Sequence, residues 1–222
     1  MLFLNTKSLR NKIYILLILT PLLLISDQLQ AKETKLLILG DSLSAAYGLK
    51  QEQGWVSLLQ DAWQNKDIII INAAISGETT DGALARLPRL LKQHSPTHIF
   101  VELGGNDGLQ GHPVSKIRNN LEKIIQLSQV SKVKVILQQM QIPTNYGKRY
   151  TQMFTGSYAQ LAEQYDLIML PFFLENIALD KSLMQRDGIH PTAEAQIIIA
   201  KDMQQRLGDI FPPSRIKNNQ LE

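Results

Sequence analysis

Five short apolar runs, each separated from the next by a segment with helical spacing, restrict the possible folds of this chain more than any other feature. The runs are rich in Ile, Val and Leu and occupy residues 35–39, 68–71, 99–103, 133–137 and 167–170. Because their apolar residues do not alternate with polar ones, each run is typical of a strand covered on both faces. The sequence therefore predicts an α/β fold, with a parallel sheet between two layers of helices.

The segments between these runs have the periodicity of amphipathic helices. Apolar residues at positions i, i+3, i+4, i+7 and i+8 mark a helix over residues 55–63, and similar spacings recur over 117–124 and 154–165. A final helix is expected over 192–207, with Thr192 as its N-cap. Pro88 lies within a helical pattern, where we expect it to kink or divide the helix.

The first 31 residues have the composition of a secretory signal peptide. Three bases precede an apolar run at residues 13–25, and the small residue Ala31 follows soon afterwards. We expect cleavage after Ala31 and a periplasmic or secreted protein without stable membrane insertion, although an uncleaved anchor is the alternative. Residues 32–211 are then the folded domain, and residues 212–222 are a flexible tail.

Composition excludes several classes of function. The chain has no cysteine among its 222 residues, so a disulfide framework, a thiol nucleophile and a thiolate metal site are all excluded. Three of the 23 basic residues but only one of the 20 acidic residues lie before position 32, which leaves the remainder nearly balanced in charge. No stretch there gathers enough bases to bind nucleic acid. No metal site is expected, because Pro96 breaks the helix that His94 and His98 would need to share.

Ligands of a parallel α/β sheet bind beyond the carboxyl ends of its strands. Polar and glycine-rich segments follow the predicted strands at residues 40–42, 76–78 and 104–107, and a further such segment spans 187–191. Ser42 lies just after the first strand, where a serine is more often an ordinary turn residue than a nucleophile. His190 stands three residues after Asp187, with Gly188 between them, so a tight turn can bring the carboxylate to the imidazole. A turn that merely caps the final helix is the alternative.

Acyl transfer also requires hydrogen-bond donors for the oxyanion that develops in the reaction. The backbone N–H groups of Ser42 and Gly77 and the side-chain amide of Asn106 all follow strands at the same predicted edge of the sheet. Each residue alone is more often a turn or capping residue, but their combination is much rarer. The sequence thus indicates a hydrolytic site at this edge.

Four blocks of sequence resemble those of the SGNH (GDSL) hydrolases and occur in the same order. They are Gly-Asp-Ser-Leu-Ser at 40–44, Gly77, Gly-Gly-Asn-Asp at 104–107 and Asp-Gly-Ile-His-Pro at 187–191. The similarity extends from about residue 35 to residue 211 and is greatest to the bacterial periplasmic thioesterase, lysophospholipase and arylesterase branch. Ala46 departs from that branch, whose members carry glycine before the tyrosine.

The resemblance implies a three-layer α/β/α sandwich around a five-stranded parallel sheet. It also implies Ser42 as nucleophile, His190 as general base and acid, and Asp187 as the residue that orients the histidine. The oxyanion hole would comprise Ser42, Gly77 and Asn106, and no cofactor or metal would be needed. We expect a monomer that acts on small acyl esters or thioesters, such as fatty acyl thioesters, lysophospholipids and aryl esters.

The residues that contact the acyl group are less evident from the sequence. Two residues flank the serine and five lie in later loops, where ordinary packing is the alternative role. These candidates are Asp41, Leu43, Ile75, Leu109, Ile142, Pro143 and Tyr146. Two other functions remain open: a carbohydrate acetylesterase with the same four blocks, and a non-catalytic binding protein that retains the fold.

Overall fold

The computed structural model describes residues 33–211. The predicted signal peptide at residues 1–31 and the predicted tail at 212–222 lie outside this range. None of the helices within 33–211 combines the length and apolar character required to cross a membrane.

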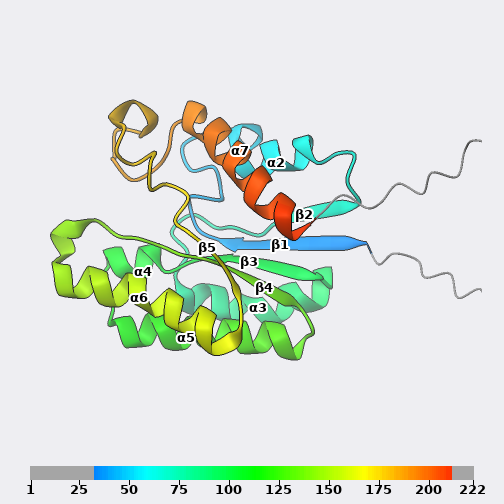
Figure 1. The fold of residues 1–222 in the computed structure, drawn as a ribbon, viewed down its shortest axis with the longest axis horizontal. Helices are drawn as coiled ribbons and strands as arrows, with labels where there is room; N and C mark the ends of the chain where they lie inside the picture. Colours follow the sequence, from blue (N-terminus) through cyan, green and yellow to red (C-terminus); the bar gives the residue numbers. More distant parts are fainter. Residues whose placement is uncertain (1–32, 212–222) are drawn as a thin grey trace, which may run out of the picture. The chain divides into compact units, whose positions relative to one another are not determined.

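A single five-stranded parallel sheet forms the middle of the described region, as predicted (Figure 1). Its strands lie in the order β2-β1-β3-β4-β5. Their bounds are β1 (Thr34–Gly40), β2 (Ile68–Asn72), β3 (His98–Glu102), β4 (Lys134–Gln138) and β5 (Ile168–Leu170). Each strand falls within about two residues of an apolar run, because a strand covered on both faces must be apolar throughout.

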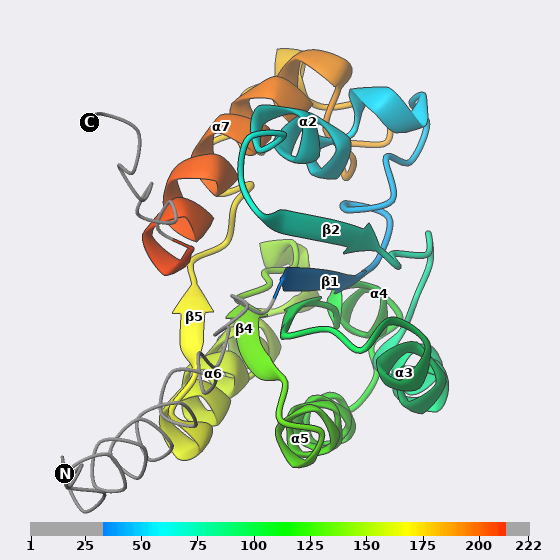
Figure 2. The ribbon, with the colours of Figure 1, turned by 90° about the vertical axis from the view of Figure 1, so that its right-hand side faces the viewer.

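Helices cover both faces of the sheet, which confirms the three-layer arrangement (Figures 1 and 2). One layer contains α2 (Trp55–Ala62) and α7 (Ala193–Ile210), which pack against each other. The other layer contains α3 (Thr80–His94), α4 (Gly105–Leu109), α5 (Val114–Val130) and α6 (Lys148–Tyr165). Short 3-10 turns occur at residues Gln51–Gln53, Thr144–Tyr146 and Lys181–Leu183.

The core lies on both sides of β1. Residues 36–39 are completely buried, as are Trp55 and Trp63 of the α2 region. Trp55 packs edge-on against Phe100 of β3, and Trp63 packs similarly against Phe211. Both tryptophans thus support the fold and are unavailable to an external ligand.

Two local predictions differ from the structure in detail. α3 continues through Pro88, so the proline does not divide the helix. Buried leucines around it, among them Leu87 and Leu91, hold the helix against the sheet despite the missing backbone N–H group. Leu109, which the sequence places in a loop, is instead the last residue of the short helix α4. Thr192 caps α7 as predicted, with its side chain accepting a hydrogen bond from the backbone N–H of Ala195.

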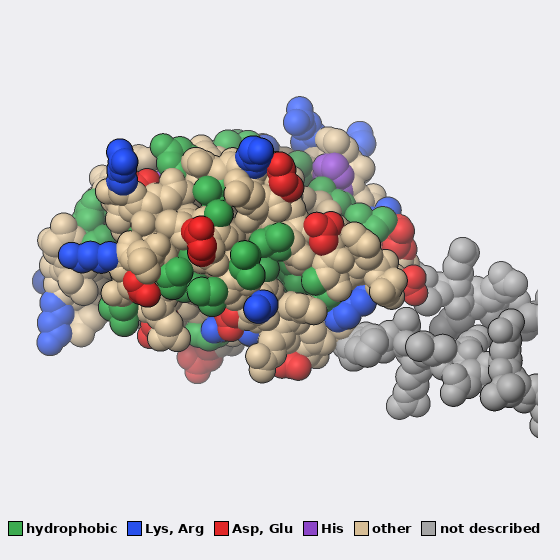
Figure 3. All heavy atoms as spheres, turned by 90° about the horizontal axis from the view of Figure 1, so that it is seen from above, with side chains coloured by type: hydrophobic (Ala, Val, Ile, Leu, Met, Phe, Trp, Pro, Cys, Tyr) green, Lys and Arg blue, Asp and Glu red, His purple; other side chains and the backbone are tan. Residues whose placement is uncertain are grey.

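Charge on the surface is mixed. Figure 3 looks onto the layer formed by α2 and α7, where basic and acidic side chains are intermingled among apolar ones. The described part of this face carries no continuous basic stripe.

Candidate active site

The segments singled out in the sequence meet where the strand order reverses. β1 pairs with β2 on one side and with β3 on the other, so the chain leaves these neighbouring strands in different directions. A crevice forms at such a position beyond the carboxyl ends of the strands. Ser42 follows β1 by two residues, and Asn106 lies in α4 directly after β3.

Ser42, His190 and Asp187 form a hydrogen-bonded chain. The Nε2 atom of His190 lies 2.8 Å from the Oγ atom of Ser42. The Nδ1 atom of the same ring lies 2.7 Å from the Oδ2 atom of Asp187. A proton on Nδ1 is held by the carboxylate, which leaves Nε2 free to accept the hydroxyl proton. The arrangement is chemically competent to activate the serine.

A tight turn holds Asp187 in place. Its Oδ1 atom accepts hydrogen bonds from the backbone N–H groups of Ile189 and His190, at 2.9 and 3.0 Å. Partial burial of Asp187 opposes its ionisation, yet these two bonds and the one from the imidazole lower the pKa of its carboxyl group to about 2. Gly188 allows the turn because it adopts a φ of 68°, in the left-handed region. Asp187 therefore remains an anion at neutral pH.

The candidate oxyanion donors lie in segments joined by hydrogen bonds next to Ser42 and Gly77. Among residues 33–211, no hydrogen bond engages the backbone N–H of Ser42 or that of Gly77. The amide of Asn106 donates to the Oδ2 atom of Asp41 at 3.1 Å and to the backbone oxygen of Glu78 at 2.9 Å. These two bonds fix the plane of the Asn106 amide. Because both amide hydrogens are already engaged, an oxyanion bound here would share one of them with Asp41 or Glu78.

A tyrosine and a glutamine near the triad were not identified from the sequence. The ring of Tyr47 packs against that of His190, with centroids 4.2 Å apart. The side-chain amide of Gln185 donates to the backbone oxygens of Tyr47 and Pro191, at 2.8 and 3.0 Å. The contacts of Tyr47 with Gln185 and His190 join segments about 140 residues apart in sequence, so no local sequence pattern could predict them. A third residue, Glu102, could have been identified from the sequence, because it is an acid directly after the apolar residues 99–101 of β3.

The candidate substrate contacts fall into two groups. Asp41 and Leu43 are buried, and the carboxyl group of Asp41 accepts a hydrogen bond from the backbone N–H of Leu43. These two side chains support the turn around the serine, and their contact with substrate stays a prediction.

The other five candidates lie in the segments that follow β2, β3 and β4. Ile75 and Pro143 are exposed, whereas Ile142 is buried against Gly108. The hydroxyl of Tyr146 donates to the backbone oxygen of Leu109 at 2.8 Å, which ties the end of α4 to the segment after β4.

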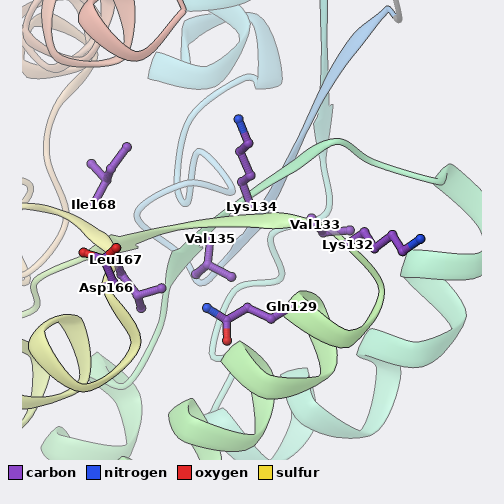
Figure 4. Close-up of a pocket in the computed structure, with 8 residues that line it drawn as sticks. All are labelled: Gln129, Lys132, Val133, Lys134, Val135, Asp166, Leu167 and Ile168. Carbon is purple, nitrogen blue, oxygen red and sulfur yellow. The ribbon is translucent and has the colours of Figure 1, made fainter.

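No group of three or more His, Asp or Glu side chains within residues 33–211 is arranged to hold a metal ion. A hollow of about 360 Å³ lies elsewhere, at the amino ends of β4 and β5 (Figure 4). Its lining includes Gln129 at the end of α5, Lys134 and Ile168. This hollow is at the edge of the sheet opposite to Ser42 and contains none of the candidate site residues.

The sequence of this chain is similar to those of known acyl hydrolases. The GDSL-like Lipase/Acylhydrolase family model matches residues 38–196. The arylesterase of Vibrio mimicus is 48% identical over 180 residues, which cover 80% of this chain and 90% of that protein. The thioesterase 1/protease 1/lysophospholipase L1 of Escherichia coli K12 is 45% identical over 186 residues, covering 84% and 88% respectively.

Solved structures show the same relationship. The esterase EstA from Pseudoalteromonas, in a crystal structure inhibited by monoethylphosphonate, superposes with a TM-score of 0.79 and 47% sequence identity. The match covers 80% of this chain and 98% of EstA. From these similarities in sequence and fold we conclude that the chain belongs to the GDSL-like lipase/acylhydrolase family.

Proposed function

We propose that this protein is a serine hydrolase that cleaves acyl esters and thioesters of small molecules through an acyl-enzyme on Ser42. The observation that carries the proposal is the continuous hydrogen-bonded chain from the Ser42 hydroxyl through His190 to Asp187. An isolated serine is a poor nucleophile, and this arrangement supplies both a base and a group that orients it. Relatives named arylesterase and thioesterase support the same chemistry.

In the first half of the reaction, the Oγ atom of Ser42 attacks the acyl carbonyl while the Nε2 atom of His190 takes its proton. Asp187, ionised at neutral pH, stabilises the imidazolium that results. The oxyanion of the tetrahedral intermediate accepts hydrogen bonds from the backbone N–H groups of Ser42 and Gly77 and from the amide of Asn106. Loss of one such donor costs about 10²–10³ in kcat.

In the second half, the intermediate collapses and His190 donates its proton to the leaving alcohol or thiol. Water then attacks the acyl group on Ser42, and His190 acts again as the base. The tetrahedral intermediate releases the carboxylic acid and returns the proton to Ser42. Every step uses groups of this chain and water.

The substrates proposed in particular are fatty acyl thioesters, lysophospholipids and aryl esters. The names of the relatives support this range. Exposed apolar side chains in the candidate substrate segments, such as Ile75 and Tyr146, are suited to an acyl chain.

We also propose a signal peptide at residues 1–31, a periplasmic or secreted location and a monomeric state. Mass spectrometry of the mature N-terminus and the mass in solution test these three.

A carbohydrate acetylesterase is a weaker alternative. Enzymes of that kind stack sugars on exposed aromatic platforms, whereas Trp55 and Trp63 are completely buried. We expect faster hydrolysis of p-nitrophenyl octanoate than of the acetate. A strict preference for the acetate, together with release of acetate from acetylated xylan, would favour the alternative.

Replacement of the proposed nucleophile tests the mechanism. Ser42→Ala is expected to fold normally and to lose about 10⁶ in kcat, because no other hydroxyl occupies this position. A fluorophosphonate probe should label the original protein on Ser42 and leave the variant unlabelled. Failure to label the original protein, combined with no hydrolysis of any ester, would instead favour a non-catalytic binding protein.

A further inference from the structure

Glu102 is a buried acid that the proposed mechanism does not use. It is the last residue of β3, and its side chain is completely inaccessible to solvent. Its Oε2 atom accepts hydrogen bonds from the hydroxyl of Ser44 at 2.7 Å and from the backbone N–H of Asp41 at 3.2 Å. These two residues flank the nucleophile on either side. Glu102 therefore lies directly beneath the turn that presents Ser42.

The space around this carboxyl group is closely filled. A Cβ atom on Gly40 would lie 2.7 Å from the Oε2 atom of Glu102 and 3.0 Å from the side chain of Ser44. The glycine thus allows the backbone of the turn to approach the carboxyl group. The other oxygen of Glu102, Oε1, is buried, and within residues 33–211 no N–H or hydroxyl group donates to it.

A second buried carboxyl group connects Glu102 to the oxyanion site. Asp41 is 3% exposed, and its Oδ1 atom accepts a hydrogen bond from the backbone N–H of Leu43 at 3.0 Å. Its Oδ2 atom accepts the bond from the amide of Asn106 at 3.1 Å. The same pair of acids therefore contacts the nucleophile turn and the side chain proposed to bind the oxyanion.

Two adjacent carboxyl groups in a buried site cannot both ionise without a large cost. Burial and the negative charge of Asp41 raise the pKa of Glu102 well above its ordinary value. Burial also raises the pKa of Asp41, but the N–H of Leu43, a hydrogen bond from Glu102 and the charge of His190 oppose that rise, while Asp107 adds to it. Of the two carboxyl groups, Glu102 is therefore the one that favours the protonated form, because its pKa is raised further above the ordinary value.

We propose that Glu102 is a positioning residue of this hydrolase, whose carboxyl group holds residues 41–44 in the conformation that presents Ser42 and, through Asp41, fixes the amide of Asn106. The inference rests on the proposed function, because it concerns the alignment of that same site. In its protonated form Glu102 accepts hydrogen bonds from the turn and donates one to Asp41. It touches no reacting atom, so its effect on the reaction is through the geometry of other groups.

Two substitutions separate this role from simple filling of the core. Glutamine retains an acceptor for Ser44 and a donor for Asp41, so Glu102→Gln should keep kcat within about threefold of the original protein. Glu102→Leu has a similar volume but neither group, so kcat should fall by about 10–100-fold with KM changed less than twofold. The rate of labelling of Ser42 by a fluorophosphonate should fall in parallel with kcat.

Gln138→Leu is the matched control. Gln138 is a completely buried polar residue at the end of the neighbouring strand β4, and its amide donates to backbone oxygens including that of Pro171. This variant should lose stability as Glu102→Leu does, yet keep its kcat. Equal losses of kcat in the two leucine variants would reduce Glu102 to an ordinary core residue and overturn the proposal.

Other outcomes are equally decisive. Unchanged kcat in Glu102→Leu, or a loss in Glu102→Gln as large as that in the leucine variant, would overturn the proposal. If Glu102→Leu does not fold, Ser44→Ala removes one of the same hydrogen bonds and should lower kcat about 3–10-fold without raising KM; no loss would count against the role.

Infrared spectroscopy at pH 8 tests the protonation state directly. The original protein should show the C=O band of a protonated carboxylic acid, and Glu102→Gln should lack it; absence of this band from the original protein would contradict the proposal. An original protein that hydrolyses no ester and does not react with the fluorophosphonate would instead refute the proposed function itself.

Discussion

The turn at Asp187 illustrates how a single carboxylate can serve both geometry and charge. Three hydrogen bonds converge on it, two from the backbone and one from the imidazole of His190. The backbone bonds shape the turn, and the third bond sets the tautomer of the histidine. Removal of the negative charge should therefore affect catalysis much more than folding.

We predict that Asp187→Asn lowers kcat by about 10³–10⁴, because an amide can donate to Nδ1 and stabilise the wrong tautomer. The pKa of Asp187 is lower in the folded protein than in the unfolded chain, so its stabilising contribution is present above pH 4 and disappears as the pH falls from about 4 to about 2. Steady-state kinetics and acid unfolding of both proteins measure these effects. An asparagine variant with nearly full kcat would contradict the role of the carboxylate.

Ala46 adopts a backbone conformation that favours glycine, with a φ of 57°, and its side chain is buried. We predict that Ala46→Gly changes the free energy of unfolding by less than about 1 kcal/mol, because the strain relieved is offset by greater freedom of the unfolded chain. Ala46→Val should cost about 2 kcal/mol or more, because a β-branched residue fits this conformation poorly and the methyl group already lies close to Gly54. Urea unfolding of the three proteins provides the comparison, and a valine variant as stable as the original would contradict this account.

At the scale of elements, two segments far apart in sequence form the catalytic edge. Residues 41–49 follow β1, and residues 184–191 precede α7. The side chain of Gln185, in the second segment, donates to the backbone oxygen of Tyr47 in the first, and the packing of Tyr47 against His190 adds a second connection. The distance between Ser42 and His190 thus depends on how firmly these two segments are held together.

We predict that Gln185→Leu lowers kcat about tenfold with little change in KM, because the histidine segment loses the side-chain hydrogen bond to Tyr47 that holds it to the serine segment, together with the bond to Pro191 within its own turn. Gln204→Leu, at an exposed position of α7, is the control and should leave kcat unchanged. Kinetics on p-nitrophenyl butyrate distinguish the two variants. If Gln185→Leu loses stability but keeps its kcat, the hydrogen bonds of Gln185 do not align the catalytic residues.

For the molecule as a whole, the start of β3 and the end of α7 meet at the edge of the sheet away from the site. His98 packs edge-on against Phe211, with ring centroids 4.7 Å apart, and its Nδ1 atom lies 2.9 Å from the hydroxyl of Thr97. Burial, together with the nearby charge of Lys134, lowers the pKa of His98 to about 4. The folded state therefore favours the neutral ring.

We predict that the stability of the protein falls as the pH decreases from about 6.5 to about 4, because the unfolded chain takes up a proton on this histidine before the folded protein does. The contribution of His98 is fully present above pH 6.5. His98→Gln should remove this part of the pH dependence, as measured by thermal unfolding at pH 7 and pH 4.5. The same loss of Tm in both proteins would assign the effect to another group.

The sequence by itself determined the strands, the main helices and the layered fold, because burial on two faces and helical periodicity leave local patterns in the chain. It also marked Ser42, Gly77, Asn106 and His190 as residues at one edge of the sheet, and the family resemblance supplied their expected roles. Only the tertiary structure decided that the serine and the imidazole lie 2.8 Å apart.

The tertiary structure also revealed the contacts of Tyr47 and Gln185 and the direction of the Asn106 amide towards Asp41 and Glu78. These contacts join segments between about 30 and 150 residues apart, so they depend on strand order, register and turn geometry. Local periodicity records which face of an element is buried, but it contains no information about which distant side chain lies opposite. The fold could therefore be predicted from the sequence, whereas the alignment of the catalytic residues is determined only in the folded chain.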